Sequence, residues 1–124
     1  MKLMLAEDEP GLSRALTAIL QHSDYEVDTA LDGLTALENL LTNDYDAAIL
    51  DIMMPGIDGL EATRQIRALD REDAATTPII AVSANAFADD RRLSREAGMN
   101  AHLSKPVSSQ DLVEALAHIA ADAS

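Results

Sequence analysis

The chain has 124 residues and no cysteine, and 48% of it is hydrophobic, which is enough for one domain with a sizeable core but excludes disulfides and thiolate metal sites. Its formal net charge of −13 repels a phosphate backbone, so we expect no nucleic-acid binding by this chain. No apolar run is long enough to span a membrane and the N-terminus is too short and acidic for a secretory signal, so we expect a cytoplasmic protein without membrane insertion.

Five short apolar runs alternate with helical patterns along the chain. We expect the runs to be strands, at residues 2–6, 25–30, 46–51, 78–84 and 101–106. Apolar residues at helical spacing predict the helices that follow them, at residues 10–20, 32–41, 58–69, 86–100 and 108–121. This alternation predicts an α/β fold, a single domain over residues 1–124 with a doubly wound parallel sheet and helices on both faces.

Several residues mark the expected helix ends. Pro10 suits a first turn, Asp32 and Asp58 are expected N-caps, and Gly98 is a natural C-cap. Asp8 could also cap the helix that begins at Pro10, whereas Glu9 is interpreted as a surface or cap residue. The second helix is expected to bury one face that carries four leucines, namely Leu34, Leu37, Leu40 and Leu41.

Polar residues end four of the five apolar runs. These are Glu7, Asp8 and Glu9 after the first run, Asp51 after the third, Ser83 in the fourth and Lys105 in the fifth. The strands of a parallel sheet all point the same way, so these side chains should meet at one edge, where ligands bind in such folds. Clustered carboxylates are tolerable around a hard divalent cation, and Mg²⁺ fits better than Ca²⁺ because it needs few carboxylates and retains several waters.

Asp51 is the candidate for covalent chemistry. Pro55, Gly56 and Gly59 predict a tight turn after it, so Asp51 should be presented at the lip of the sheet. A carboxylate there can attack phosphorus without a general base if its charge is neutralised and the phosphoryl group is aligned. The metal ion and Lys105 would supply that neutralisation.

Four motifs carry a resemblance to a known family, namely LAEDEP, LDIMMPGIDGLE, PIIAVSANA and HLSKP. In order and spacing they resemble the receiver domain of bacterial response regulators over residues 1 to about 121. The resemblance implies a flavodoxin-like sheet of five strands in the order 2-1-3-4-5 with five helices. It also implies a phosphoacceptor that takes a phosphoryl group from a histidine kinase or a histidine phosphotransfer domain.

The resemblance implies a role for each matching residue. Asp51 would be phosphorylated, and Mg²⁺ would be held by Asp8, Asp51 and the backbone carbonyl of Met53, with Glu7 acting through metal-bound water. The phosphoryl group would be bound by Ser83, the backbone of Ala84 and Lys105. Ser83 and His102 would form the switch that changes the face of the fourth helix, fifth strand and fifth helix, and Met53 and Asn85 would tune dephosphorylation.

Two positions depart from the family pattern. Glu7 replaces the usual Asp of the acidic pair, which adds one methylene to the metal site. His102 replaces the usual Tyr or Phe, as in receivers attached to hybrid sensor kinases. The chain is therefore either a domain of a larger kinase or a stand-alone regulator, and a phosphorylation-dependent homodimer is left open.

Three other functions can be weighed against a regulatory phosphoacceptor that turns over no external substrate. An aspartyl-phosphate phosphatase needs a second acid two residues after its nucleophile, where this chain has Met53. A degenerate receiver that only binds partners would not need the set formed by Asp8, Asp51, Ser83 and Lys105. A flavin- or nucleotide-binding domain of similar topology would need a glycine-rich loop after the first strand, which the sequence lacks.

Overall fold

A five-stranded parallel sheet forms the centre of the computed structural model, with its strands in the order β2-β1-β3-β4-β5. The structure describes residues 2–54, 56–68, 77–83, 88–105 and 107–122. The strands are β1 (Lys2–Ala6), β2 (Glu26–Ala30), β3 (Ala47–Asp51), β4 (Ile79–Ser83) and β5 (Ala101–Ser104). The helices are α1 (Pro10–His22), α2 (Gly33–Thr42), α3 (Gly59–Arg67), α4 (Ala88–Ala97) and α5 (Ser109–Asp122). The predicted fold class is confirmed.

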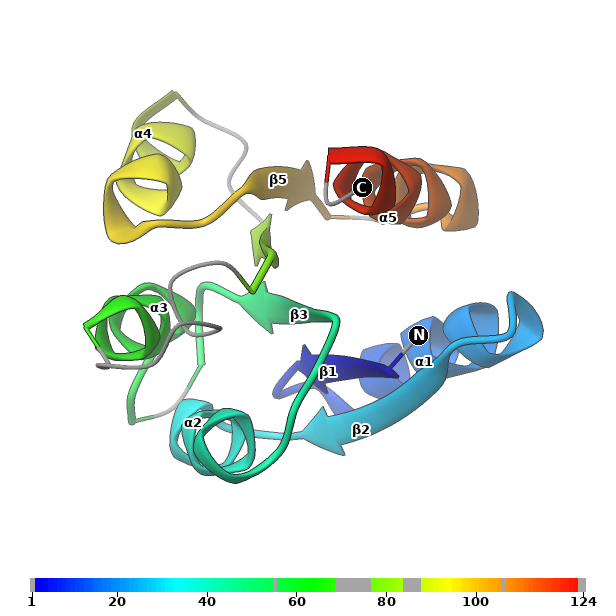
Figure 1. Cartoon of the computed structure of the whole chain (residues 1–124), viewed down its shortest axis with the longest axis horizontal. Coiled ribbons are helices and arrows are strands. Elements are labelled where there is room, and N and C mark those ends of the chain that lie inside the picture. The colour runs from blue at the N-terminus through cyan, green and yellow to red at the C-terminus, as the bar shows by residue number, and fades with distance from the viewer. Residues whose placement is uncertain (1, 55, 69–76, 84–87, 106, 123–124) are drawn as a thin grey trace.

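The helices cover both faces of the sheet. In Figure 1, α1 and α5 lie on one side of the strands, and α2, α3 and α4 lie on the other. Side chains alternate along a strand, so neighbouring residues of β1 face different cores. Leu3 and Leu5 pack in the core that contains Leu16 of α1 and Leu112 of α5. Met4 packs in the opposite core with the buried residues of α2 and α3.

β3 and β4 are the most deeply buried strands, and every residue of both is buried. Each has a parallel neighbour on both sides, and both of its faces are covered by helices. Asp51 is the last residue of β3, so its main chain is held by the sheet while its side chain reaches the edge. Of the strands predicted over 78–84 and 101–106, the structure shows β4 over Ile79–Ser83 and β5 over Ala101–Ser104, and residues 84 and 106 lie outside the described residues.

The prediction for α2 was wrong for two of its four leucines. Leu37 and Leu40 are buried, but Leu34 is 52% exposed and Leu41 is 39% exposed. The buried stripe also contains Ala36, and it is centred about a quarter turn away from the two exposed leucines at 100° per residue. The prediction used only the leucines and therefore placed the buried face of α2 on the wrong side of Leu37 and Leu40.

No helix in the described ranges combines the length and apolar character needed to cross a membrane.

Arg67, at the end of α3, uses its half-buried guanidinium to join two parts of the fold. It donates from Nε and Nη2 to the carbonyl of Gly98 at 3.0 and 2.9 Å, and from Nη2 to Oδ1 of Asn100 at 2.9 Å. Gly98 follows α4 with a φ of +105°, a left-handed conformation that favours glycine and agrees with the predicted C-cap.

Candidate metal site at the sheet edge

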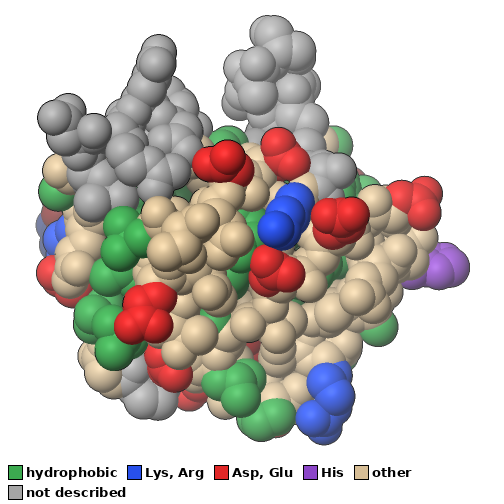
Figure 2. All heavy atoms as spheres, turned by 60° about the horizontal axis from the view of Figure 1, so that its bottom comes forward, with side chains coloured by type: hydrophobic (Ala, Val, Ile, Leu, Met, Phe, Trp, Pro, Cys, Tyr) green, Lys and Arg blue, Asp and Glu red, His purple; other side chains and the backbone are tan. Residues whose placement is uncertain are grey.

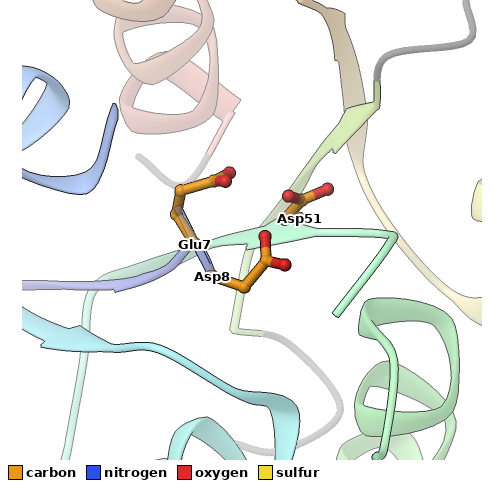
Figure 3. Close-up of side chains that lie close together, drawn as sticks. All are labelled: Glu7, Asp8 and Asp51. Carbon is orange, nitrogen blue, oxygen red and sulfur yellow. The ribbon is translucent and has the colours of Figure 1, made fainter. Parts of the chain in front are cut away.

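Three carboxylates meet where β1 and β3 end. Carboxylate oxygens of Glu7, Asp8 and Asp51 lie within 4.8 Å of one another. Figure 3 shows Glu7 and Asp8 on one stretch of chain after β1, with both side chains extending toward the side on which Asp51 lies at the end of β3. Glu7 and Asp51 are buried and Asp8 is exposed, so the cluster has a closed inner part and one side open to solvent.

Lys105 is the cation of this cluster. Its Nζ lies 2.8 Å from Oδ2 of Asp51 and 3.2 Å from both carboxylate oxygens of Glu7. Figure 2 shows a basic side chain surrounded by acidic side chains on the face turned forward in that view. The side chains of Glu7 and Asp51 are only 1% and 2% exposed, so solvent screens these ion pairs poorly.

Burial and like charge act on the protonation of Glu7. The pKa of Glu7 is raised to about 7, chiefly by burial and further by the neighbouring Asp51 carboxylate, while Lys105 and the N–H of Glu9 oppose the rise. Burial lowers the pKa of Lys105, but its contacts with Asp51 and Glu7 outweigh burial and raise that pKa overall. The site therefore keeps Lys105 charged, and Glu7 holds its proton more tightly than a carboxyl group exposed to water does.

The residues of this cluster fit a divalent cation. When its three carboxylates are ionised, the cluster together with the Lys105 ammonium has a formal charge of −2. The ligand atoms that the three acids offer are oxygens, which a hard cation such as Mg²⁺ prefers. Oε2 of Glu7 is buried and accepts no hydrogen bond within the described residues, although Lys105 lies beside it. A buried charged oxygen without a hydrogen bond is costly, and a cation or a metal-bound water would satisfy it.

The backbone after Asp51 is fixed by close contacts. The N–H of Met53 donates to Oδ1 of Asp51 at 3.1 Å, while the Met53 side chain is 70% exposed. Gly59 packs against the main chain of Asp51, because a Cβ atom there would lie 2.4 Å from the Asp51 carbonyl oxygen. Gly33 approaches the same loop, and its Cβ would lie 1.5 Å from the carbonyl oxygen of Ile57.

Glu9 caps α1, so the alternative that Asp8 does so was wrong. The carboxylate of Glu9 accepts hydrogen bonds from the N–H groups of Gly11 at 2.9 Å and Leu12 at 2.5 Å. These two backbone hydrogen bonds lower the pKa of Glu9. The three consecutive acids therefore have separate positions: Glu9 serves the helix, while Glu7 and Asp8 face Asp51.

Ser83 lies on β4, the strand beside β3, and His102 lies on β5, the next strand outward. Ser83 is buried at the end of β4, and its carbonyl accepts a hydrogen bond from the N–H of Lys105 at 2.8 Å. His102 is half-buried in β5 and opposite Ala81 in the parallel register. Ala84 and Asn85 lie outside the described residues, so their predicted roles stay predictions.

Sequence patterns did not identify the two glycine contacts. Gly59 follows Asp58, whose side chain accepts a hydrogen bond from the N–H of Glu61 at 2.8 Å and so caps α3 as predicted. Gly33 likewise follows the N-cap Asp32. Gly33 and Gly59 each follow an aspartate in the sequence. An Asp-Gly pair indicates a turn or a helix start, but it does not indicate which atoms the glycine contacts.

A doubly wound sheet with an acidic cluster at the carboxyl ends of its strands defines a class of α/β proteins that bind ligands at this edge. A family model described as the response regulator receiver domain matches residues 3–117. The chain belongs to the response regulator receiver domain family, which is part of two-component signalling.

Curated proteins similar to this chain include response regulators. The response regulator ArlR of Staphylococcus saprophyticus is 39% identical over 97% of this chain, and the Staphylococcus aureus ArlR is 38% identical. The chain spans about half the length of these curated relatives, with 51% of each covered.

Two solved structures share both the fold and substantial identity. A response regulator from Chloroflexus aurantiacus has a TM-score of 0.89 and 32% identity, with 97% of each chain covered. The receiver domain of the sensor histidine kinase PA1611 from Pseudomonas aeruginosa has a TM-score of 0.86 and 37% identity, with 94% of each chain covered. In that structure a magnesium ion is coordinated in the active-site cleft.

Proposed function

We propose that this chain is a phosphoacceptor that receives a phosphoryl group on Asp51 from a phosphohistidine of a histidine kinase or a histidine phosphotransfer domain. The contact that carries this proposal is the 2.8 Å ion pair between Nζ of Lys105 and Oδ2 of Asp51 inside the acidic cluster. It places a fixed positive charge beside the oxygen that would bind phosphorus. Residues 1–124 are proposed to form one receiver domain, with a regulatory role and no external substrate.

Mg²⁺ is the proposed cofactor. Asp8, Asp51 and the backbone carbonyl of Met53 would hold it directly, and Glu7 would act through metal-bound water. When bound, Mg²⁺ neutralises negative charge on the phosphoryl oxygens and aligns the phosphoryl group with the acceptor. The acidic cluster and the magnesium ion of the PA1611 receiver domain support this assignment.

The transfer step forms one bond and breaks another. A carboxylate oxygen of Asp51 bonds to phosphorus as the P–N bond of the phosphohistidine breaks, and the electron pair of that bond stays on the imidazole nitrogen. The products are an acyl phosphate on Asp51 and a neutral histidine, because the imidazole ring leaves with a proton on its other nitrogen. The N–H of Met53 and Nζ of Lys105 hold the carboxylate in one orientation, which favours an in-line approach.

The response to phosphorylation is proposed to pass through Ser83 and His102. The phosphoryl group adds strong acceptor oxygens that would draw the Ser83 hydroxyl, the backbone of Ala84 and Lys105 toward Asp51. Movement of Ser83 would open space for the His102 ring and change the face formed by α4, β5 and α5. This is a shift between two packings of the same elements.

Phosphoryl lifetime is proposed to depend on Met53 and Asn85. The Met53 side chain is apolar and exposed next to Asp51, so it is poorly suited to position an attacking water. A polar residue at either position would change the rate of hydrolysis. A phosphorylation-dependent homodimer and a cytoplasmic location are further parts of this proposal.

Intact-mass measurement after incubation with acetyl phosphate and Mg²⁺ tests the function. We expect one phosphoryl adduct on the wild type, none on Asp51→Asn, and none on the wild type in excess EDTA. Asp58→Asn is a matched control, because it makes the same change at a helix cap outside the cluster. An adduct on Asp51→Asn at wild-type yield, or sustained turnover of an aryl phosphate, would contradict the proposal.

A further inference from the structure

Gly33, the first residue of α2, leaves less room for a side chain than any other glycine of the chain. A Cβ atom built on it would lie 1.5 Å from the carbonyl oxygen of Ile57 and 2.6 Å from the carbonyl carbon. These are main-chain atoms, which cannot swing aside as the end of a flexible side chain can. A methyl group at this position would therefore force the start of α2 and Ile57 apart by about 1.5 Å.

Ile57 lies in the β3–α3 loop, whose two ends are fixed. The N–H of Ile52 donates to the carbonyl of Val82 at 2.9 Å, so the start of the loop is held by β4. The N–H of Gly59 donates to the carbonyl of Ile52 at 3.1 Å, so the end of the loop is tied to its start. A displacement of Ile57 is then taken up inside the loop, which also contains Met53, whose carbonyl is a proposed Mg²⁺ ligand.

The opposite movement, of α2 away from the loop, also leads to the acidic cluster. Three residues before Gly33, the carbonyl of Ala30 accepts a hydrogen bond from the N–H of Glu7 at 3.1 Å. The middle of α2 is held in the core by its buried side chains, among them Leu37 and Leu40. The start of the helix would therefore yield first, and it would displace the main chain of Glu7.

Asp51 depends less on the contact at Gly33. It is the last residue of β3 and pairs with Val82 of β4 in the parallel register. Its carboxylate is held by Nζ of Lys105 at 2.8 Å, and its carbonyl is packed by Gly59. The contact of Gly33 thus bears on the groups that would surround the metal ion and not on the phosphoacceptor itself.

We propose that Gly33 is a positioning residue for the Mg²⁺ site. Because it has no side chain, α2 can hold the β3–α3 loop close to β1, and with it the Met53 carbonyl on the same side as the acidic cluster. This inference rests on the proposed function, which assigns Mg²⁺ to that cluster. Gly33 and Gly59 then have separate effects: one sets the affinity for Mg²⁺, and the other supports Asp51.

Calorimetric titration with Mg²⁺ in the absence of phosphodonor is the first test. We expect Gly33→Ala to bind Mg²⁺ at least fivefold more weakly than the wild type. Ala36→Gly is the matched control, because it changes one methyl group at a buried position of the same helix without pushing on the loop. It should also be destabilised, yet bind Mg²⁺ within twofold of the wild type. NMR spectra of the metal-free proteins should show larger amide shifts at Glu7 and Met53 in Gly33→Ala than in the control.

The Mg²⁺ dependence of labelling by acetyl phosphate separates metal positioning from support of Asp51. We expect Gly33→Ala to need at least fivefold more Mg²⁺ for its half-maximal rate, and to come within threefold of the wild-type rate at saturation. Gly59→Ala should remain at least tenfold slow at every Mg²⁺ concentration. Loss of stability alone would not produce this split in protein that is shown to be folded by circular dichroism.

Ile57→Ala tests the same contact from the loop and decides the matter if Gly33→Ala does not fold. It removes the side chain that packs Ile57 against the core but keeps the carbonyl, so we expect Mg²⁺ binding at least threefold weaker. Wild-type Mg²⁺ affinity in folded Gly33→Ala, or in Ile57→Ala, would overturn the inference.

The positioning role and the phosphoacceptor fail in different ways. A wild type that neither binds Mg²⁺ nor forms an adduct on Asp51 would contradict the proposed function. Mg²⁺ binding that depends on Gly33 without any adduct would contradict phosphotransfer alone. A wild type that binds Mg²⁺ and is labelled, with Gly33→Ala matching it in affinity and rate, would contradict the role of Gly33 alone.

Discussion

Nζ of Lys105 lies 2.8 Å from Oδ2 of Asp51, although 54 positions separate these residues in the sequence. The same ammonium group lies 3.2 Å from both oxygens of Glu7. One cation thus offsets the repulsion between two buried carboxylates at the ends of different strands. This contact links the stability of the protein to the chemistry of its candidate site.

Replacement of Lys105 by Met should destabilise the metal-free protein. Glu7 and Asp51 would remain buried without a cation, so the free energy of unfolding should fall by about 2–3 kcal/mol at pH 8. The loss should be smaller at pH 5.5, where Glu7 is protonated. Urea unfolding at both pH values measures this, and an equal loss at both would contradict the account.

The raised pKa of Glu7 predicts how stability depends on pH without metal. Below pH 4.5 the Glu7 carboxyl is protonated in both states, whereas between 4.5 and about 7 only the folded state keeps the proton. The stabilisation from that proton is therefore fully present below pH 4.5 and is lost as pH rises through about 7. We expect wild type to lose about 2 kcal/mol relative to Glu7→Gln between pH 5 and 8. Parallel stability curves for the two proteins in EDTA would refute this.

Asp8 and Glu9 are adjacent acids that should respond in opposite ways. Asp8→Ala should weaken Mg²⁺ binding at least tenfold and leave the metal-free melting temperature unchanged or slightly higher, because it removes repulsion without removing the α1 cap. Glu9→Ala should lower the melting temperature and keep Mg²⁺ affinity within twofold. Calorimetric titration and thermal unfolding measure the two effects, and the reverse pattern would contradict the assignment.

Gly59→Ala should impair both folding and phosphorylation. Its added methyl group would overlap the Asp51 carbonyl oxygen, so backbone must move and the cost should exceed about 2 kcal/mol. The displaced Asp51 should also accept phosphate at least tenfold more slowly in protein that remains folded. Gly11→Ala is the control, because its methyl group meets only the flexible end of Glu9, 3.1 Å away. A Gly59→Ala protein with wild-type stability and labelling rate would disprove this contact's importance.

Several features of the fold could be predicted because they depend on local pattern. Alternating strand and helix signals gave five strands and five helices, and side-chain chemistry located the caps at Asp32 and Asp58. The meeting of Glu7, Asp8 and Asp51 followed from strand direction, since parallel strands end at the same edge. The roles of Met53, Ser83, Ala84, Asn85 and His102 came from the resemblance and remain predictions.

Other features depend on which atoms meet in space. Leu34 and Leu37 are the same residue type on one helix, but only the packing of α2 against the sheet decides which is buried. Glu9 rather than Asp8 caps α1 because of the direction in which the chain leaves β1. The close contact of Gly33 exists only because α2 is placed next to the loop after β3.

The sequence by itself determined the class of fold, the set of acidic residues and the edge at which they gather, because side-chain period is a local property of the chain and the alternation of strands with helices makes the strands parallel. Only the tertiary structure decided that Lys105 pairs with both Asp51 and Glu7 and that Gly59 touches the Asp51 backbone. Such a contact is made or lost when the separation between two segments far apart in sequence changes by a few tenths of an ångström. The packing of helices on the sheet sets those distances, and residue spacing does not specify them.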